Sequence, residues 1–305
     1  MLSRLFTSHY CLRLALGVGL FIGVTLSGAT LDWGDGVNLQ PSYFNGGEVN
    51  LGWELMVRQT SIKTVRIEIE PSVSLATVKR WLREAHAHGY TVIATYHYFP
   101  SNGSDSVAEL MKAAHWWQAN YASLREDGPV IVNLMNEWGS HHQTAVTYAA
   151  AYNEAVAIVR SVYAGPLVVD LPGWAQETYV AREASPLLAD QNLVFSVHLY
   201  SGAYVQHGAD RWMKKIDLDA LAECGRPVIV GEFGAARKGK ADWSGLVDHA
   251  RSKGWTLIAW AWNGDGEQMN MVRPIWGEKV DATIFSVAPY FSKVYKKLRP
   301  ALATK

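Results

Sequence analysis

Residues 130–138 read VIVNLMNEW, a run of β-branched and other apolar residues that ends in Asn-Glu-Trp. Apolar runs of this length are typical of β-strands that are covered on both faces. A Gly-Pro turn at 128–129 precedes the run, and apolar residues at helical spacing follow over 149–159. The segment therefore predicts a turn, a strand and a helix, with polar side chains where the strand ends.

The same unit recurs along the chain. Eight strands that alternate with helices form either a closed barrel or a doubly wound sheet. The count of eight, and the lack of a Gly-rich phosphate loop after the first run, favour an α/β fold with a single (β/α)8 TIM barrel. A last helix is expected from the apolar stripe over 287–298. The expected strands are Gly36–Leu39, Thr64–Ile69, Thr91–His97, Val130–Asn136, Leu167–Asp170, Val194–Leu199, Val228–Glu232 and Thr256–Trp262.

The first 29 residues have the pattern of a signal peptide. Arg4 and Arg13 precede an apolar run over Leu14–Leu26, and Ser27-Gly28-Ala29 supplies small residues for cleavage. We expect cleavage after Ala29, a catalytic domain over residues 30–305, and a secreted or periplasmic protein that no longer contacts the membrane. An uncleaved membrane anchor is the alternative.

Composition excludes some partners. Without the expected signal, 26 basic residues face 28 acidic ones, a net charge of −2. Such a chain has no surplus of cations to neutralise phosphates, so nucleic acid is not an expected partner. Cys224 is then alone and forms no internal disulfide, and nothing in the composition suggests more than a monomer. The 13 tryptophans and 14 tyrosines suit the stacking of aromatic rings on sugars.

Two glutamates stand at the ends of predicted strands on opposite sides of the barrel. Glu137 ends the fourth and Glu232 the seventh, and catalytic groups of such barrels lie at the C-terminal ends of the strands. Glycosidic cleavage needs such a pair, one carboxyl protonated and the other ionised. Arg66, on the second strand, would keep Glu232 ionised by pairing with it, although Glu68 or Glu70 is an alternative partner.

The segments around both glutamates resemble those of glycoside hydrolase family 5, in clan A. VNLMNEW at 132–138 and VGEFG at 230–234 are similar to the two catalytic segments of that family. VVDLPGWAQ at 168–176, FSVHLY at 195–200 and IAWAWNG at 258–264 are similar to segments of bacterial β-mannanases. The similar segments extend in order over residues 35 to 265.

The resemblance implies a role for each matching residue. Glu137 matches the general acid/base and Glu232 the nucleophile of a retaining mechanism. Trp260 is expected to pack in the interior of the barrel. No cofactor is expected. No metal site is expected either, because the adjacent His141 and His142 lack further ligands at the required spacing. The expected substrate-binding residues are Arg66, His97, Asn136, Trp138, Trp174, His198, Tyr200 and Trp262.

The sequence thus predicts an endo-β-1,4-glycanase whose partner is a polysaccharide or oligosaccharide, with mannan or glucomannan as the expected substrate. An endo-β-1,4-glucanase of the same family is the first alternative. A catalytically inactive barrel that binds polysaccharide is the second, and the presence of both glutamates argues against it. The loop after Tyr200 reads SGAY at 201–204 and differs from the acidic-aromatic run common in mannanases. The choice between mannan and glucan as substrate therefore stays open.

Overall fold

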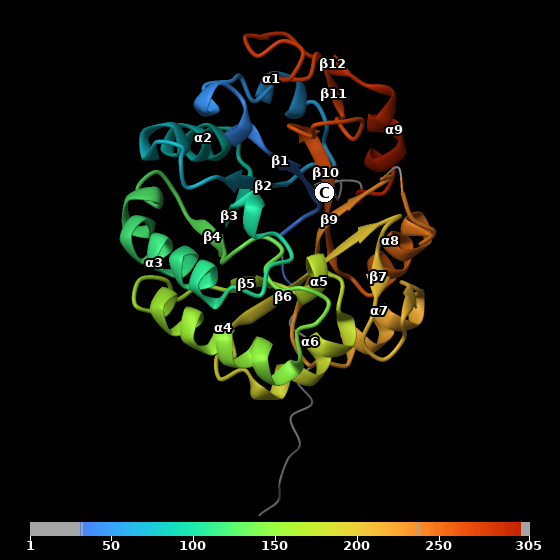
Figure 1. The fold of residues 1–305 in the computed structure, drawn as a ribbon. Helices are drawn as coiled ribbons and strands as arrows, with labels where there is room; N and C mark the ends of the chain where they lie inside the picture. Colours follow the sequence, from blue (N-terminus) through green and yellow to red (C-terminus); the bar gives the residue numbers. More distant parts are fainter. Residues whose placement is uncertain (1–30, 32, 237, 300–305) are drawn as a thin grey trace, which may run out of the picture.

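The computed structural model describes residues 31, 33–236 and 238–299. Eight parallel strands close into a barrel in the order β1-β10-β9-β6-β5-β4-β3-β2, and helices surround it (Figure 1). The predicted (β/α)8 barrel is confirmed. The barrel strands are β1 (Gly36–Leu39), β2 (Thr64–Ile69), β3 (Thr91–Tyr96), β4 (Val130–Asn133), β5 (Leu167–Asp170), β6 (Leu193–Tyr200), β9 (Val228–Gly234) and β10 (Thr256–Asn263).

The helices pack their apolar stripes on the outside of the strands. Ser74 and Ser106 cap α2 and α3 by accepting bonds from backbone N–H groups in the first turn, which fixes where each helix begins. Among the described residues no helix is both long and apolar enough to cross a membrane. The α-helices are α1 (Trp53–Met56), α2 (Leu75–Ala87), α3 (Val107–Leu124), α4 (Ala145–Arg160), α5 (Pro172–Ala175), α6 (Thr178–Ala184), α7 (Lys215–Ala222), α8 (Trp243–Ser252) and α9 (Pro289–Tyr295).

The inside of the barrel has two layers. The lower layer is an apolar cluster of one residue from each of five strands: Ile93, Val168, Val194, Ile229 and Ile258. Two residues further along the same strands, side chains point inward again, because strand side chains alternate between faces. There the barrel interior becomes polar.

The boundary of β4 differs from the prediction. We expected a strand to Asn136, but β4 ends at Asn133. Beyond it the backbone leaves the regular ladder: Leu134 N–H still donates to Val168 O, while Asn136 N–H crosses to Tyr96 O. The other predicted strands agree with the structure to within two residues at each end.

Two small hairpins were not predicted. β7 (Tyr204–Val205) pairs with β8 (Arg211–Trp212), and β11 (Val272–Arg273) pairs with β12 (Ser286–Val287). The second hairpin corrects the last helix, which begins only at Pro289. Two-residue strands carry too little periodicity to be recognised in a sequence.

Candidate active site

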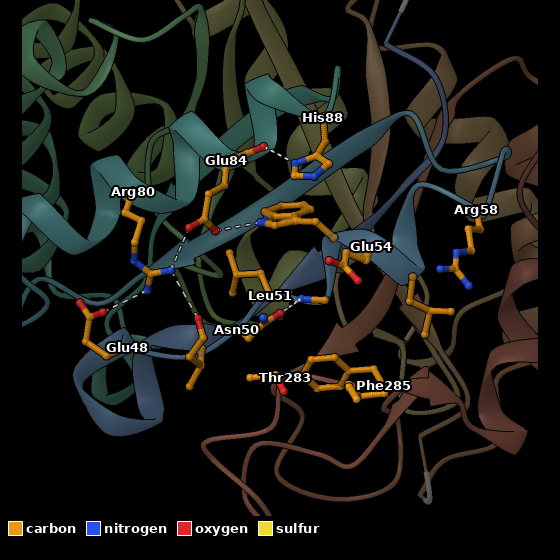
Figure 2. A pocket seen from close by; sticks show the side chains of 15 residues that line it. Glu48, Asn50, Leu51, Glu54, Arg58, Arg80, Glu84, His88, Thr283 and Phe285 are labelled. Carbon is orange, nitrogen blue, oxygen red and sulfur yellow. Dashed lines mark hydrogen bonds and ion pairs between the residues drawn. The ribbon is translucent and has the colours of Figure 1, made fainter.

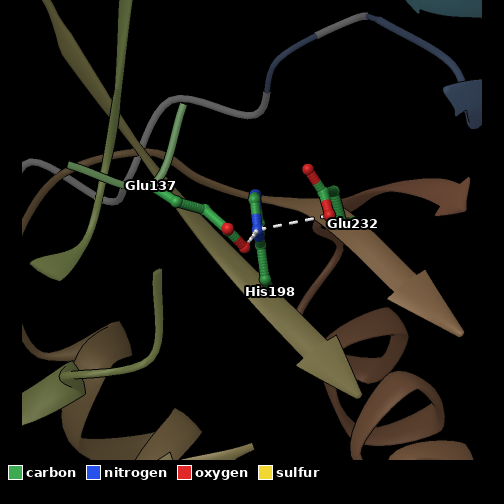
Figure 3. A group of neighbouring side chains, drawn as sticks. All are labelled: Glu137, His198 and Glu232. Carbon is green, nitrogen blue, oxygen red and sulfur yellow. Dashed lines mark hydrogen bonds and ion pairs between the residues drawn. The ribbon is translucent and has the colours of Figure 1, made fainter. Parts of the chain in front are cut away.

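Glu137, from the segment after β4, and Glu232, in β9, meet at the C-terminal mouth of the barrel. His198 of β6 stands between them, with Nδ1 2.8 Å from Glu137 Oε1 and 3.5 Å from Glu232 Oε2 (Figure 3). The facing atoms of the three side chains all lie within 4.8 Å of one another. Carboxyl groups about 5 Å apart are typical of retaining glycosidases, whereas inverting enzymes place them further apart.

The backbone at Glu137 turns its side chain into the barrel mouth. Glu137 has a φ of 48°, a left-handed conformation that is uncommon outside glycine. Two hydrogen bonds hold it: its N–H donates to Asp170 Oδ2 at 3.0 Å, and its C=O accepts from Gly103 N–H at 2.7 Å. Strained backbone of this kind persists where the surroundings fix it, often at functional sites.

Gly231 allows β6 and β9 to approach each other below Glu232. The register between these strands shifts after Val197, so that His198 is opposite Glu232 and Gly231 is the extra residue. A Cβ atom at Gly231 would lie 2.2 Å from Ser196 Oγ and 3.0 Å from His198 Nε2. Only glycine therefore lets His198 reach its position between the carboxyl groups.

Arg66 is the central cation of the site and is fully buried on β2. Three buried carboxyl groups surround its guanidinium, those of Glu68, Glu232 and Asp170. The Asp170 contact is the longest, with Nη2 3.5 Å from Oδ2. The predicted pairing with Glu232 is present, and the alternative pairing with Glu68 is present as well. Its hydrogen bonds run to Asn133 Oδ1 at 2.9 Å, Asn38 Oδ1 at 2.9 Å, Asn136 Oδ1 at 2.7 Å, Glu68 Oε1 at 2.8 Å and Glu232 Oε1 at 3.0 Å.

Glu232 has donors that Glu137 lacks. The Tyr200 hydroxyl donates to Glu232 Oε2 at 2.6 Å, and Arg66 donates to Oε1. Burial, with the neighbouring Glu232 charge, raises the pKa of Tyr200 well above its usual value, so the hydroxyl keeps its proton. Within the part of the chain that the structure describes, the Glu137 carboxyl group has a 3.2 Å bond from Asn102 Nδ2 and the contact with His198, and no arginine or tyrosine donor. The surroundings therefore stabilise a negative charge on Glu232 more than on Glu137.

Burial dominates the titration of both glutamates. It raises the pKa of Glu137 to about 7, and the Asp170 carboxylate acts in the same direction. Burial also raises the pKa of Glu232 to about 7, although His198 and Arg66 oppose the shift. The two groups are close enough to titrate as a pair. Because the donors lie on the Glu232 side, the pair that holds one proton carries it on Glu137.

His97 lies just after β3 and connects the site to a second group of acids. Its Nδ1 is 2.8 Å from the Tyr43 hydroxyl and 3.2 Å from Glu70 Oε1, and its Nε2 is 3.3 Å from Glu68 Oε2. Glu70 also accepts from Tyr43 at 2.5 Å and from Phe99 N–H at 3.0 Å. His97 is thus held in one orientation at the edge of the cleft.

A cleft of about 540 Å³ opens above the two glutamates. Its size and mixed polar and apolar lining suit a small ligand or a few sugar units. The residues that line it are Gln40, Tyr43, Phe44, His97, Phe99, Asn102, Asn136, Glu137, Tyr200, Glu232, Trp260, Gly264, Asp265 and Gly266.

The tryptophan predictions need correction. Trp260, expected to be packing, lines the cleft, and its indole N–H donates to Asp265 Oδ1 at 2.9 Å. Trp262, expected to be a sugar platform, is fully buried and donates to Leu51 O at 3.1 Å. Trp138 is also fully buried, packs against Tyr152, and donates to the backbone. Neither buried indole presents a face to a ligand.

Trp174 remains available at the surface. Its side chain is 40% exposed and packs beside Gly103, next to the Asn102 that bonds Glu137. His141 lies 5.3 Å from its ring and is fixed by Glu177. The exposed indole therefore lies on the Glu137 side of the site.

Glu137, His198 and Glu232 have the spacing of a set of metal ligands as well as that of a glycosidase pair. The charge next to them favours the second interpretation. Arg66 Nη1 lies 3.0 Å from Glu232 Oε1, so a bound cation would stand beside a guanidinium. The set is thus poorly suited to a divalent ion.

The comparisons with known proteins identify the family. The sequence profile described as cellulase, glycosyl hydrolase family 5, matches residues 51–266. The chain belongs to this family. It is 28% identical over 227 residues to a mannan endo-1,4-β-mannosidase of Streptomyces lividans, covering 68% of this chain and 57% of the relative. It is 25% identical over 197 residues to one of Cellvibrio japonicus, covering 62% and 45%.

Comparison with solved structures finds proteins that have the same fold as this chain. The catalytic domain of a mannanase from Streptomyces sp. SirexAA-E is 21% identical, with a TM-score of 0.69 over 96% of this chain and 99% of that one. At this identity the likeness shows the fold alone. The chain spans about half the length of the curated relatives that it matches.

A larger hollow of this family 5 barrel lies away from the two glutamates. It has a volume of about 680 Å³ and opens between α1, α2 and the segment before β12 (Figure 2). Charged groups in its lining pair with each other. Arg80 pairs with Glu48 at 3.3 Å and with Glu84 at 3.2 Å, and Glu84 also accepts a hydrogen bond from the Trp53 indole. Size alone therefore does not mark the reactive site.

Three residues of the family 5 site were missed from the sequence. Asp170 ends β5, a position where the barrel rule asks for functional groups. Glu68 is two residues from Arg66 and so points to the same side of β2. The signal for both was present in the sequence. Trp260 had no such signal, because the regular alternation of β10 favoured Trp262 equally.

Proposed function

We propose that this protein is a retaining endo-β-1,4-glycanase that hydrolyses mannan or glucomannan with Glu232 as nucleophile and Glu137 as general acid/base. The observation that carries the proposal is the asymmetric carboxyl pair around His198. The facing atoms lie within 4.8 Å, and of the two catalytic carboxyl groups it is Glu232 that accepts bonds from Arg66 and Tyr200. Such an arrangement suits one ionised and one protonated carboxyl.

In the first step, an oxygen of Glu232 attacks the anomeric carbon while Glu137 transfers its proton to the leaving glycosidic oxygen. The glycosidic bond breaks, and the sugar is bound to Glu232 as an ester. In the second step, Glu137, now ionised, takes a proton from water, and the resulting hydroxide equivalent displaces Glu232. Both carboxyl groups return to their starting states, with the anomeric configuration retained.

The neighbouring residues position the sugar and the nucleophile. Asn136, held at its Oδ1 by Arg66, has its Nδ2 group available to the 2-hydroxyl of the sugar. Trp260 lines the cleft and is the proposed platform for the sugar that forms the ester. Trp174 is the proposed platform beyond Glu137, on the leaving-group side.

Mannan is proposed over glucan because both curated relatives bear the name mannan endo-1,4-β-mannosidase. An endo-β-1,4-glucanase is the second candidate, since the matching family profile is named for cellulase. These two candidates have the same reaction mechanism. They differ in which configuration of the sugar's 2-hydroxyl group the cleft binds. We also propose that the protein is exported, on the signal pattern of residues 1–29, which lie outside the described residues. We propose a monomer because nothing in the composition suggests a larger assembly.

The test is the release of reducing sugar from β-mannan, glucomannan and carboxymethylcellulose, measured side by side with the purified protein and with Glu232→Ala. Release from mannan but not from carboxymethylcellulose supports the mannanase. The reverse moves the assignment to the glucanases. Full activity of a folded Glu232→Ala on any of the three would remove Glu232 from the mechanism.

A further inference from the structure

Glu68 is a third carboxyl group beneath the catalytic pair, and the mechanism above does not use it. It lies on β2 with no exposed surface. One oxygen, Oε1, accepts from Arg66 Nη1 at 2.8 Å. The other, Oε2, is buried, lies 3.3 Å from His97 Nε2, and has no fully formed hydrogen bond in the described structure.

The Arg66 Nη1 nitrogen has more acceptors than hydrogens. It carries two N–H bonds, yet Glu68 Oε1, Asn38 Oδ1 and Glu232 Oε1 lie 2.8, 2.9 and 3.0 Å from it. Glu68 and Glu232 therefore compete for the same donor. An ionised Glu68 takes more of it, and a neutral Glu68 leaves more of it to Glu232.

The contact between Glu68 Oε2 and His97 Nε2 requires one proton, bound to one of the two atoms. Two acceptors at 3.3 Å would repel, and an ionised oxygen without a donor is costly in a buried site. On the far side of the ring, Nδ1 faces the Tyr43 hydroxyl and Glu70 Oε1. A proton on Oε2 can thus be donated to Nε2, while Nδ1 donates towards Tyr43 and Glu70.

We infer that Glu68, together with His97, is a positioning residue that holds one proton below the catalytic pair and sets the alkaline limit of activity. The inference rests on the proposed function. When Glu68 holds the proton, the Nη1 group of Arg66 donates mainly to Glu232, and this favours the ionised form of the nucleophile. When Glu68 releases it, a new negative charge lies near Glu137 and helps this general acid to keep its own proton at higher pH.

The direction of the charge effects agrees with this arrangement. Burial raises the pKa of Glu68 to about 7, opposed by Arg66, and the negative charge of Glu137 adds to the rise. By reciprocity, an ionised Glu68 raises the proton affinity of Glu137. The charged or titratable groups that face Glu68 are Arg66 on its own strand, His97 after β3, Glu137 after β4, Glu232 on β9 and Tyr43 after β1.

The experiment compares the pH profiles of kcat/KM for wild type and Glu68→Gln. The variant is neutral at every pH, like wild type at low pH, so the acidic limb is expected to stay in place. The alkaline limb is expected to move down by about one pH unit, which lowers kcat/KM about tenfold on that side. Glu48→Gln, a matched change at an exposed glutamate paired with Arg80, is expected to move neither limb.

A purely structural role for Glu68 would lower kcat/KM equally at all pH values and leave both limbs in place, which would overturn the inference. With an aryl glycoside whose leaving group needs no protonation, the difference between the alkaline limbs is expected to disappear. Persistence of that difference would also contradict the link to Glu137.

A measurement on the unmodified protein covers the case in which Glu68→Gln does not fold. Carboxyl ¹³C NMR titration is expected to show the Glu68 carboxyl group titrating near pH 7, as a group separate from the coupled steps of Glu137 and Glu232. A Glu68 carboxyl group that is already ionised at pH 5 would overturn the inference. This titration needs no substrate, so its result stays independent of whether the proposed hydrolysis is found.

Discussion

Nη1 of Arg66 lies 3.0 Å from Oε1 of Glu232, with the guanidinium fully buried and the carboxyl group almost so. In such a site a charge pair is weakly screened, and removing one partner leaves the other buried without compensation. The same guanidinium also bonds Asn136 and Asn133. It therefore couples the charge of the proposed nucleophile to the position of the residue proposed to bind the sugar.

Replacement of Arg66 by lysine is expected to damage both stability and activity. Lysine keeps the charge but not the fork that reaches several acceptors at once. We expect a loss of about 3–5 kcal/mol in the free energy of unfolding, since buried partners are left unpaired, and a fall of about 100-fold in kcat/KM. Chemical denaturation and steady-state kinetics measure the two effects. Near-normal kcat/KM in a folded Arg66→Lys would contradict the role of the fork.

Replacement of Glu137 by alanine is expected to divide substrates by their leaving group. Loss of a general acid typically costs about 10²–10⁴-fold on a substrate that must be protonated. An activated aryl glycoside needs no protonation and is expected to form the ester at close to the wild-type rate. Azide, which attacks without a general base, is expected to speed its turnover. The absence of both effects in a folded variant would show that Glu137 is not the acid/base.

The two tryptophans of β10 are expected to fail in different ways. Trp260→Ala removes a surface of the cleft, so we expect a rise in KM and about a 10–100-fold fall in kcat/KM with little change in melting temperature. Trp262→Ala opens a hole in the core, with an expected loss of about 3–5 kcal/mol in the free energy of unfolding. Calorimetry and kinetics on both variants separate the effects, and a reversed pattern would restore the sequence-based assignment.

The buried carboxyl groups also predict how stability depends on pH. The pKa values of Glu68, Glu137 and Glu232 rise from 4.5 to about 7 on folding. Between these values the folded state binds more protons than the unfolded state, so their contribution to stability is full below pH 4.5 and is lost as the pH rises through 7. Glu137→Gln, which breaks no pair with Arg66, is therefore expected to change the melting temperature more favourably at pH 8 than at pH 5. An equal change at both pH values would contradict the burial argument.

Much of the fold followed from the sequence because buried parallel strands and amphipathic helices leave strong periodic signals. The barrel rule then placed Glu137 and Glu232 together, and the alternation along β2 placed Arg66 inside. The same rules also place Glu68 and Asp170 at the site, although Glu68 was expected only as an alternative partner of Arg66 and Asp170 was not predicted there. Positions at backbone irregularities were not predictable in the same way.

β10 illustrates the limit. Its register against β1 shifts between Ala259 and Asn263, so the period of two that would place Trp260 and Trp262 on the same side does not hold. Trp260 faces the cleft, and Trp262 turns into the core. The turn that aims Glu137 is a second case, since its left-handed backbone depends on bonds from Asp170 and Gly103 that are distant in sequence.

The most direct test of the central claim is to trap the covalent intermediate. The protein is incubated with an activated 2-deoxy-2-fluoro aryl glycoside of a β-1,4-linked disaccharide, and its intact mass and peptide masses are recorded. The account predicts one added glycosyl group, located by peptide mapping on Glu232, and no addition to Glu232→Ala. Rapid hydrolysis of the parent glycan by a protein that gains no label, or a label on another residue, would contradict a double displacement through Glu232.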